Sequence, residues 1–448
     1  MTHARNLSNR STDFVSVKDF GAVGDGTTDD TAAIAAAWSA SKYITFPAGT
    51  YKVSSLPNFA SNGARIETVG KVTINYTGAG NGLTVDSGSG AGVKNYDIQI
   101  GPMTIVGSAS AQNGVYIRGI THSVFKRLRP INFPLSAMRC EFMVSNSFEE
   151  FCYSGNEAGI TVATAKGIIL EKRNAGEQSS DCTFINPIIE GTTGDGIYGP
   201  EAAQCTFIGG TSEGNGAGGG AGAVYLGVNS FGNTFIGLDM ESNGKAADAT
   251  SYQVKNYGLR NKFITPFCDS TISGLFWAAG GNSLSIEGGQ IADLKIDAGV
   301  RNTNTLGVAY TGTITDNGTD TRRIQEFYIV TNATLADSQI TFGTWTPTAT
   351  NLTSSTTAVL TGSYQKVGRM VYFTIYVTAT GGGNTTASSA NFSAPFSQLS
   401  SAPGTSTTAN NGTAAGIGNN AIFSNLIYCQ NWAAQATMIV SGSYLTAS

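Results

Sequence analysis

The chain has 448 residues, enough for one long domain and a smaller one, and only 12% of them are charged, compared with roughly 25% in ordinary globular domains. The net charge of −4 and the lack of a basic stripe argue against nucleic acid as a partner. No apolar run is long enough for membrane insertion, and residues 1–13 are too polar for a signal peptide, so we expect a soluble protein made in the cytosol.

Residues 14–53 carry the sharpest local pattern. A strand over 14–17 leads through a Gly-rich turn at 21–26 to a helix from Thr31 to about Ser39, and a strand over 43–46 follows with a Pro-Ala-Gly turn. Thr28, Asp29 or Asp30 can cap this helix. Such a helix, with Ile34 and Trp38 on one face, would cover the open end of a sheet.

This segment resembles the start of the pectate-lyase-like superfamily, which includes plant polygalacturonases and many phage tailspikes and capsule depolymerases. The resemblance implies that the segment caps a right-handed parallel β-helix and has no catalytic role, so Asp25, Asp29 and Asp30 are expected to be structural. The matching residues are Asp19, Phe20, Gly21, Ala22, Gly24, Asp25, Gly26, Asp29, Asp30, Thr31, Pro47, Gly49 and Tyr51.

The catalytic motifs of polygalacturonases, which are Asn-Thr-Asp, Asp-Asp, His-Gly and Arg-x-Lys, are absent beyond residue 54. The chain has only two histidines, His3 and His122, so we expect neither a His-based triad nor a metal site. His122 opens the segment HSVFKRL and is interpreted as a stacked turn residue at the first position of a repeat.

One nine-residue pattern recurs from Cys182 onward, with a small polar residue first, Phe third and an acid ninth. The copies begin at residues 182, 205, 233 and 261, which are 23, 28 and 28 residues apart, and NSLSIEGGQ from Asn282 continues the series 21 residues later. Short Ile-, Phe- and Val-rich strands broken by Gly and Asn, with two or three per repeat stacked about 4.8 Å apart, predict a parallel β-helix. The copies are CTFINPIIE, CTFIGGTSE, NTFIGLDME and NKFITPFCD.

Two further features of the repeats carry expectations. Cys182 and Cys205 occupy the position that Asn233 holds in another copy, which predicts unpaired structural thiols. The interval from 146 to 182 exceeds the period, so a loop is expected near 173–180, and the Gly-rich tract 214–222 is a second candidate.

Acidic residues recur on the outer face of the repeats. Leu238 and Met240 alternate with Asp239 and Glu241, so burying the apolar pair leaves both acids outside. In the same register Glu190, Glu213 and Asp269 fall on neighbouring repeats, and like charges at strand spacing raise pKa values. The alternative is that these acids are solvated turn residues.

Glycoside hydrolysis by a carboxylate pair would use such an arrangement. The candidate catalytic residues are Glu213, Asp239, Glu241 and Asp269. The candidate substrate-binding residues are Glu190, Tyr198, Tyr225, Phe267 and Trp277, the aromatic ones as surfaces on which sugars stack.

Beyond the repeats, residues 301–332 are interpreted as a linker and 333–448 as an antiparallel β-sandwich with alternating strands. This last part resembles the small β-sandwich modules that end many phage fibres and tailspikes, which implies trimerisation or glycan binding. The matching residues are Gly343, Trp345, Pro347, Gly362, Tyr364, Lys366, Gly368, Val371 and Phe373.

Together these patterns predict an all-β chain, with an arm at 1–13, a cap at 14–53, a right-handed parallel β-helix over 54–300, the linker and the sandwich. The two resemblances imply a homotrimeric phage tailspike, made in the host cytoplasm and carried on the virion, whose arm binds other tail proteins. It would bind and hydrolyse a bacterial surface polysaccharide without a cofactor. Three alternatives stay open: a receptor fibre that binds glycan without cleaving it, a polysaccharide lyase that neutralises a uronate with Arg260 or Lys262, and a purely structural fibre.

Overall fold

A computed structural model describes residues 14–155, 159–269, 272–324, 327–328, 340–367, 370–395, 404–410, 420–423, 426–428, 432–435 and 437–445. The chain divides into two compact units, residues 1–336 and 337–448. The predicted arm at 1–13 lies outside the described residues.

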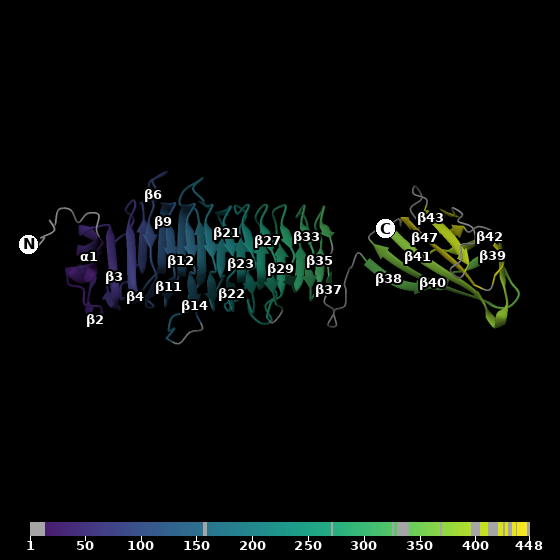
Figure 1. The fold of residues 1–448 in the computed structure, drawn as a ribbon, viewed down its shortest axis with the longest axis horizontal. Helices are drawn as coiled ribbons and strands as arrows, with labels where there is room; N and C mark the ends of the chain where they lie inside the picture. The colour runs from purple at the N-terminus through teal and green to yellow at the C-terminus, as the bar shows by residue number, and fades with distance from the viewer. Residues whose placement is uncertain are drawn as a thin grey trace, which may run out of the picture. The chain divides into compact units, whose positions relative to one another are not determined.

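The first unit is a parallel β-helix built from three parallel sheets, which we call A, B and C (Figure 1). In the regular part each coil, meaning one turn of the solenoid, passes from sheet A through a short turn to sheet C and then through a loop to sheet B. Every strand therefore lies beside its counterparts in the coils before and after it.

Sheet A contains β1 (Val15–Ser16), β2 (Asp25–Asp29), β3 (Tyr43–Val53), β4 (Arg65–Tyr76), β7 (Gln99–Ile100), β8 (Met103–Val106), β10 (Val124–Lys126), β11 (Leu128–Ile131), β13 (Ser147–Glu149), β17 (Thr183–Ile185), β21 (Thr206–Ile208), β24 (Thr234–Ile236), β27 (Lys262–Ile264), β30 (Ser285–Glu287), β33 (Asn304–Leu306) and β36 (Arg322–Ile324). Sheet B contains β5 (Leu83–Asp86), β6 (Asn95–Tyr96), β9 (Asn113–Thr121), β12 (Ser136–Val144), β15 (Lys166–Glu171), β16 (Ser179–Ser180), β19 (Ile197–Gly199), β20 (Ala202–Ala203), β23 (Gly222–Leu226), β26 (Tyr252–Asn256), β29 (Leu275–Ala278), β32 (Asp293–Ile296) and β35 (Ile314–Asp316). Sheet C contains β14 (Cys152–Ser154), β18 (Ile188–Glu190), β22 (Thr211–Glu213), β25 (Asp239–Met240), β28 (Phe267–Cys268), β31 (Gln290–Ile291), β34 (Ala309–Tyr310) and β37 (Phe327–Tyr328).

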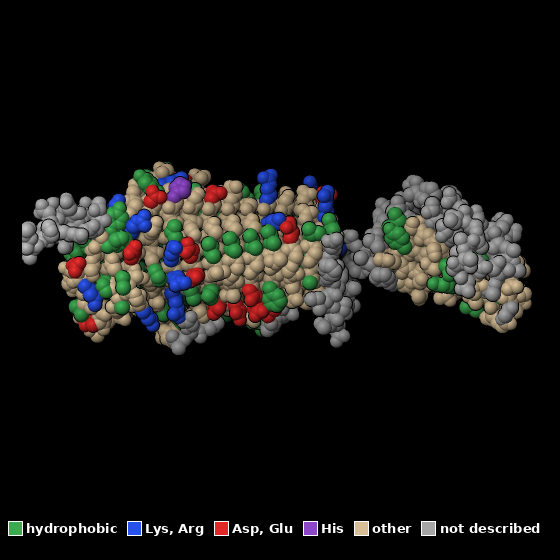
Figure 2. Space-filling view, viewed as in Figure 1, with side chains coloured by type: hydrophobic (Ala, Val, Ile, Leu, Met, Phe, Trp, Pro, Cys, Tyr) green, Lys and Arg blue, Asp and Glu red, His purple; other side chains and the backbone are tan. Residues whose placement is uncertain are grey.

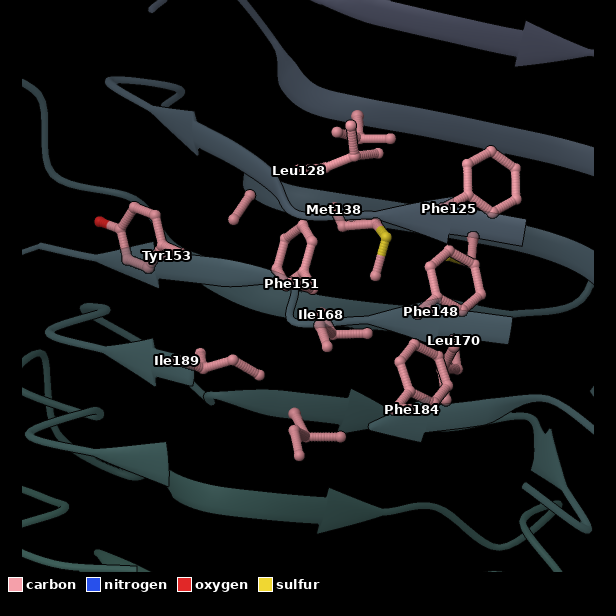
Figure 3. Close-up of a cluster of buried hydrophobic side chains, with 14 of the residues drawn as sticks. Phe125, Leu128, Met138, Phe148, Phe151, Tyr153, Ile168, Leu170, Phe184 and Ile189 are labelled. Atoms are coloured by element: carbon pink, nitrogen blue, oxygen red, sulfur yellow. The ribbon is translucent and has the colours of Figure 1, made fainter. Parts of the chain in front are cut away.

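A stack of phenylalanine rings runs through the core beneath sheet A, and part of it is drawn in Figure 3. Neighbouring ring centroids are 4.5 to 5.0 Å apart and the rings are within 8° of parallel, so the spacing follows the distance between strands. Each ring belongs to the third position of a repeat, which explains why Phe recurs there. The stack consists of Phe125, Phe148, Phe184, Phe207, Phe235 and Phe263.

The first position of the repeat forms a buried polar ladder. Asn233 accepts a hydrogen bond from the Cys205 N–H at 2.9 Å, and Asn261 accepts one from the Asn233 N–H at 3.0 Å. Cys182 and Cys205 are fully buried and unpaired, as predicted. The five described cysteines are all free thiols.

Two predicted alignments are wrong by one or two residues. Ser123, and not His122, pairs with Asn146, because the Ser123 N–H donates to Asn146 Oδ1 at 2.9 Å. His122 is instead an exposed turn residue just before the strand, with a left-handed φ of 50°. Likewise Ile286 lies beside Phe263, so this coil begins at Leu284 and not at Asn282. The inward apolar residue sets the register, and the small polar residue does not.

The N-terminal cap has the predicted elements. Helix α1 (Thr31–Ala40) packs Ile34 into the core, and Trp38 lies partly buried against it. The backbone of Asp30 begins the helix, but its buried carboxylate accepts the N–H groups of Val23 and Gly24, at 2.6 and 3.1 Å. Asp30 therefore ties the Gly-rich turn to the helix, which is a structural role. The following strand is longer than predicted, because β3 continues through a bulge between Pro47 and Gly49.

The β-helix does not end at residue 300. Strands β33 to β37 add coils as far as Tyr328, so most of the predicted linker at 301–332 is β-helix, and residues 325–326 and 329–332 of it lie outside the described residues. These coils escaped notice because Thr305, which is buried, replaces Phe at the inward position. The predicted loop near 173–180 is present between β15 and β16, where Arg173 donates to the carbonyl oxygens of Gly88 and Val93.

The second unit is an antiparallel sheet folded over its own apolar core, as the sandwich prediction required. Residues from β41 and β42 share this core although four strands separate them in the sheet order. In the described part of the chain, no helix is long and apolar enough to cross a membrane. The strands are β38 (Ile340–Trp345), β39 (Ala349–Ser354), β40 (Ala358–Val367), β41 (Met370–Ala379), β42 (Thr385–Ser393), β43 (Gly404–Asn410), β44 (Asn420–Phe423), β45 (Leu426–Tyr428), β46 (Trp432–Gln435) and β47 (Thr437–Leu445).

We expect Phe207→Ala to destabilise the β-helix by about 3–5 kcal/mol, because it removes a buried ring from the middle of the stack and leaves a cavity. Urea unfolding followed by far-ultraviolet circular dichroism measures the loss. The control is Val228→Ala, in a turn of the same coil and 69% exposed, which we expect to cost about 0.5 kcal/mol or less. Equal losses for both variants would contradict a core that depends on the ring stack.

Candidate functional site

The outer face of sheet C carries a continuous acidic patch, which we define as Glu190, Glu213, Asp239, Glu241 and Asp269. Glu190 lies directly opposite Glu213. Thr211 pairs with Asp239, which places Glu213 beside Glu241, and Asp239 pairs with Phe267, which places Glu241 beside Asp269. Figure 2 shows acidic side chains gathered over these strands, along the lower edge of the solenoid.

The predicted alternation is what turns the acids outward. Leu238 and Met240 are fully buried, whereas Asp239 and Glu241 are only partly covered. Neighbouring strands lie about 4.8 Å apart, so Glu190, Glu213, Glu241 and Asp269 each have another acid one strand spacing away. The strand neighbours of Asp239 are Thr211 and Phe267. The predicted column is therefore present in the register expected from the sequence.

Three of these carboxyl groups have raised pKa values. Burial raises the pKa of Glu213 first, followed by the charges of Glu190 and Asp239. Burial and then the charge of Asp269 raise the pKa of Asp239. For Glu241 the charge of Asp239 is the main cause of a raised pKa. Each group thus holds its proton to a higher pH than an isolated carboxyl would.

Asp239 has the least complete hydrogen bonding of the five acids. Within the described part of the chain, neither its buried Oδ1 atom nor the buried Oγ1 of Thr211, its neighbour in the preceding coil, has a hydrogen-bond partner. A buried carboxylate oxygen without a donor is costly when charged, so this site favours a proton on Asp239. The sequence held no signal for the role of Thr211.

Two members of the acidic patch are held by hydrogen bonds. Asp269 Oδ1 accepts from the Ser242 N–H at 2.9 Å and from Gln253 Nε2 at 3.2 Å. Glu190 Oε2 accepts from the Ser154 hydroxyl at 2.8 Å. Gln253 was not among the predicted site residues, because it belongs to β26 of sheet B and its side chain reaches Asp269 from there. Asp269 and Glu190 therefore have structural partners that Asp239 and Glu241 lack.

No lysine or arginine forms an ion pair with Glu213, Asp239 or Glu241 within the described ranges. Lys262 points from sheet A and pairs with Glu287 at 2.8 Å. Arg260 is exposed in the turn that precedes the same strand, with a left-handed φ of 55°. The two cations considered for uronate neutralisation are thus placed off sheet C. The described residues also contain no cluster of metal-ligating side chains.

Of the predicted aromatic residues only Phe267 lies at the patch, where it is 38% exposed beside Asp239. Tyr198, Tyr225 and Trp277 are on sheet B, so their predicted position beside the acids is wrong. They follow the loop in each coil, and its length cannot be judged from the repeat pattern.

The rings on sheet B are also covered on both sides. Tyr198 stacks on Tyr225 with centroids 5.1 Å apart, and Lys166 from the preceding coil lies 3.7 Å from its centroid. Trp277 lies between Lys255 and Lys295 of the two adjoining coils, at 4.0 and 4.1 Å. A sugar would meet only the edges of these rings.

Two loops border the acidic patch. Residues 214–221 and 241–251 connect sheet C to sheet B, and they account for the longer 28-residue spacing of these coils. The Gly-rich tract was predicted as a loop, and the structure confirms it. The second loop is tied to the first because the Gly220 N–H donates to Asp248 Oδ2 at 2.7 Å.

The described architecture is that of a parallel β-helix with an acidic outer sheet. A sequence profile described as "Rhamnogalacturonase A/epimerase, pectate lyase-like" matches residues 14–239, half of the chain. The chain belongs to this family, and the predicted superfamily is confirmed. The match ends within the acidic patch, at Asp239.

One curated relative and two solved structures are similar to the chain. The "Tail spike protein" of an Escherichia phage is 54% identical over 54 residues, which is 12% of this chain and 7% of that protein. The phage tailspike gp42 of Acinetobacter phage vb_AbaP_AS12 is 11% identical over 85% of this chain and 80% of its own, with a TM-score of 0.49. The surface adhesin PfbA of Streptococcus pneumoniae is 16% identical over 70% and 89%, also with a TM-score of 0.49. At this similarity neither structure bears on activity.

We expect Glu213→Gln to stabilise the protein at pH 7 by about 0.2–1 kcal/mol, since the charge is partly solvated and its neighbours repel it. A raised pKa in the folded state favours the protonated form, so the stability it contributes is complete below the unfolded value near 4.5 and is lost as the pH rises through the folded value. The gain should therefore vanish near pH 3. Melting temperatures across pH 3–8 test this expectation.

The matched control for this measurement is Glu149→Gln. Glu149 pairs with Lys126 at 3.1 Å, so its removal should leave stability at pH 7 unchanged or slightly lower. If Glu213→Gln instead destabilises the protein at pH 7, the charges of the acidic patch are not in repulsive contact.

Proposed function

We propose that this chain is a phage tailspike that binds a bacterial surface polysaccharide and cleaves it by glycoside hydrolysis at the acidic patch. Membership of the pectate lyase-like family and the local identity to a tail spike protein support the role. The observation that carries the chemistry is the buried, unpartnered carboxylate oxygen of Asp239 among acids with raised pKa values.

Glycoside hydrolysis needs two carboxyl groups, about 5–5.5 Å apart for retention and about 6.5–9.5 Å apart for inversion. Glu213 and Glu241 are neighbours across one strand spacing of about 4.8 Å. Asp239 and Glu241 are two positions apart along one strand, which is about 6.5–7 Å. The patch therefore supplies pairs near both distances.

We assign the general acid to Asp239. Burial and the nearby charge of Asp269 raise its pKa, which favours the protonated form that a general acid needs. That proton passes to the glycosidic oxygen as the bond to the anomeric carbon breaks. Asp269, fixed by Ser242 and Gln253, is then a positioning residue that keeps its charge near Asp239.

Glu241 is the partner carboxylate. It is the least buried of the three and lies on the outer face of sheet C one strand spacing from Glu213, so water beside a bound sugar can reach it. Acting as a base, it takes a proton from the water whose oxygen adds to the anomeric carbon. Glu213 and Glu190 would accept hydrogen bonds from sugar hydroxyls, and Phe267 offers its exposed face to a sugar ring.

A hydrolase fits the patch better than a lyase. A lyase must neutralise a uronate beside the scissile bond, and it needs a Lys or Tyr as the base. Glu213, Asp239 and Glu241 form no ion pair in the described residues, and Lys262 is engaged with Glu287 on sheet A. The acids would repel a uronate placed directly over them.

The assembly completes the proposal. We propose a homotrimer on the phage tail, with residues 1–13 binding other tail proteins and the second unit trimerising the chain or binding glycan. An exposed apolar row on sheet A supports association, because the face of a neighbouring copy can cover it. This row includes Ile208, Leu306 and Ile324, which are 39%, 44% and 53% exposed.

Asp239→Asn and Glu241→Gln should each lower the cleavage rate by about 10²–10⁴-fold, since each removes a proton donor or acceptor from the reaction. Binding to the uncleaved polysaccharide should persist. The measurement incubates each variant with surface polysaccharides from a panel of bacteria, and it scores new reducing ends together with ultraviolet-absorbing unsaturated products.

The control is Glu171→Gln, an outward acid on sheet B, which should cleave as the unchanged protein does. An absorbing product would show a lyase and overturn the hydrolase. Binding without any cleavage by the unchanged protein would make it a receptor fibre. Full activity of both Asp239→Asn and Glu241→Gln would remove the acidic patch from the chemistry.

A further inference from the structure

A groove of about 520 Å³ lies on the same side of the β-helix, in the coils that precede the acidic patch. Its lining comes from β4, β8, β11, β14 and β18 and from the turns beside them. The walls are partly apolar, with Met103 buried at the floor and Ile188 37% exposed at the rim. Such a mixed surface suits a sugar ring, which has apolar faces and polar edges.

Positive charge is concentrated in this groove. Among the described residues, Lys71, Arg127 and Arg129 line it together with the acid Glu150. Arg127 forms an ion pair with Glu150, so the cationic character of the groove depends on Lys71. Lys71 is exposed and makes no ion pair or side-chain hydrogen bond among the residues that the structure describes. In a chain with 12% charged residues, this grouping is a distinct feature.

The groove leads into the first strands of sheet C, although its cations come from β4 and β11 of sheet A and from the turn before β11. Cys152 and Ile188, which line the groove, are in register with Thr211 and then Asp239. At about 4.8 Å per strand, Ile188 lies about 10 Å from Asp239, whereas Arg127 and Lys71 lie about 19 Å and about 29 Å from it along the axis. Figure 2 shows Lys and Arg side chains over β11 and the acidic side chains farther along the same edge.

We propose that this groove binds a carboxylate-bearing sugar of the same polysaccharide that the acidic patch cleaves, an inference that rests on the proposed function. The chain of sugars lies along the solenoid axis across sheet C. Its acidic unit sits in the groove, where Lys71 Nζ and the Arg127 guanidinium bind the carboxylate.

The separation of charge sets a requirement on the substrate. The acids around Asp239 repel a carboxylate, whereas the groove attracts one. The cleaved bond therefore lies between neutral sugars, and the acidic sugar is at least one unit away in the repeat. The substrate class is an acidic polysaccharide with spaced, not consecutive, carboxylates.

The first test compares purified bacterial capsular polysaccharides in native form and after chemical reduction of their carboxyl groups to alcohols. Reduction removes the charge and keeps the glycosidic bonds. We expect the unchanged protein to cleave the native polymer with a KM at least fivefold lower, with a similar kcat. The difference should shrink as salt rises from 50 to 500 mM.

The second test uses Lys71→Met, which removes the charge and keeps the length of the side chain. We expect its KM for the native polymer to rise about 3- to 5-fold with kcat unchanged, as for loss of one partly solvated charge contact. For the reduced polymer it should match the unchanged protein. Lys71→Arg should restore binding, and Lys18→Met, which removes an exposed lysine in the cap, is the control for charge alone.

The outcomes separate this inference from the proposed function. Equal KM values for native and reduced polymer, or a Lys71→Met effect no larger than that of Lys18→Met, would overturn the acidic subsite and leave hydrolysis standing. If no polymer is cleaved, affinity electrophoresis replaces kinetics. Charge-dependent binding that Lys71→Met weakens would then support the subsite although hydrolysis has failed. A protein that acts on or binds only neutral polysaccharides would also overturn it.

Discussion

Stacking of like residues at the distance between parallel strands is the constraint on which this structure depends. The inward phenylalanines stack 4.5 to 5.0 Å apart because every coil places its third residue over that of the coil before. The same register applies on the outer face, where it places like residues side by side whether they attract or repel one another. Phe207 gains from lying over Phe184, while Glu213 must lie over Glu190. Repulsion within the acidic column therefore destabilises the β-helix, and the stacking of the buried rings offsets that loss.

The sequence predicts a residue's position well when that residue is close along the chain to one of the stacked phenylalanines. The alternation around Met240 was sufficient to place Asp239 and Glu241 outside, because strand and turn lengths between sheets A and C are constant. Tyr198 and Trp277 follow loops of variable length, so their face could not be deduced, and they lie on sheet B. The predicted position of His122 was wrong by one residue, because several small polar residues can fill the first position of a repeat. A coil was missed because Thr305 stands where other repeats have an aromatic residue.

The acids of the patch differ in how their charge is compensated, and this difference points to the division of labour. Asp269 accepts two hydrogen bonds and Glu190 one, as expected of carboxylates that stabilise turns. Asp239 leaves a buried oxygen without a donor, opposite a threonine hydroxyl that also lacks one. Buried polar atoms without a partner are uncommon in folded proteins and cost stability. Such a site favours the protonated form of Asp239, which is the form that a general acid needs.

A solenoid presents its residues in lines, and a linear polymer is the ligand that such lines fit. The cationic groove over the early coils and the acidic patch on sheet C follow one another along the axis, so a bound chain would meet opposite charges at different sugars. On sheet B the cations of Lys166, Lys255 and Lys295 instead lie over aromatic faces, where their charge is partly used within the fold. Among the described residues, Lys71 in the groove and Glu213, Asp239 and Glu241 in the patch form no ion pair, so both signs of charge are available along this side of the solenoid. A surface that positions a polysaccharide needs this succession of cationic and acidic positions along the axis. Isolated acids that only form turns would not provide it.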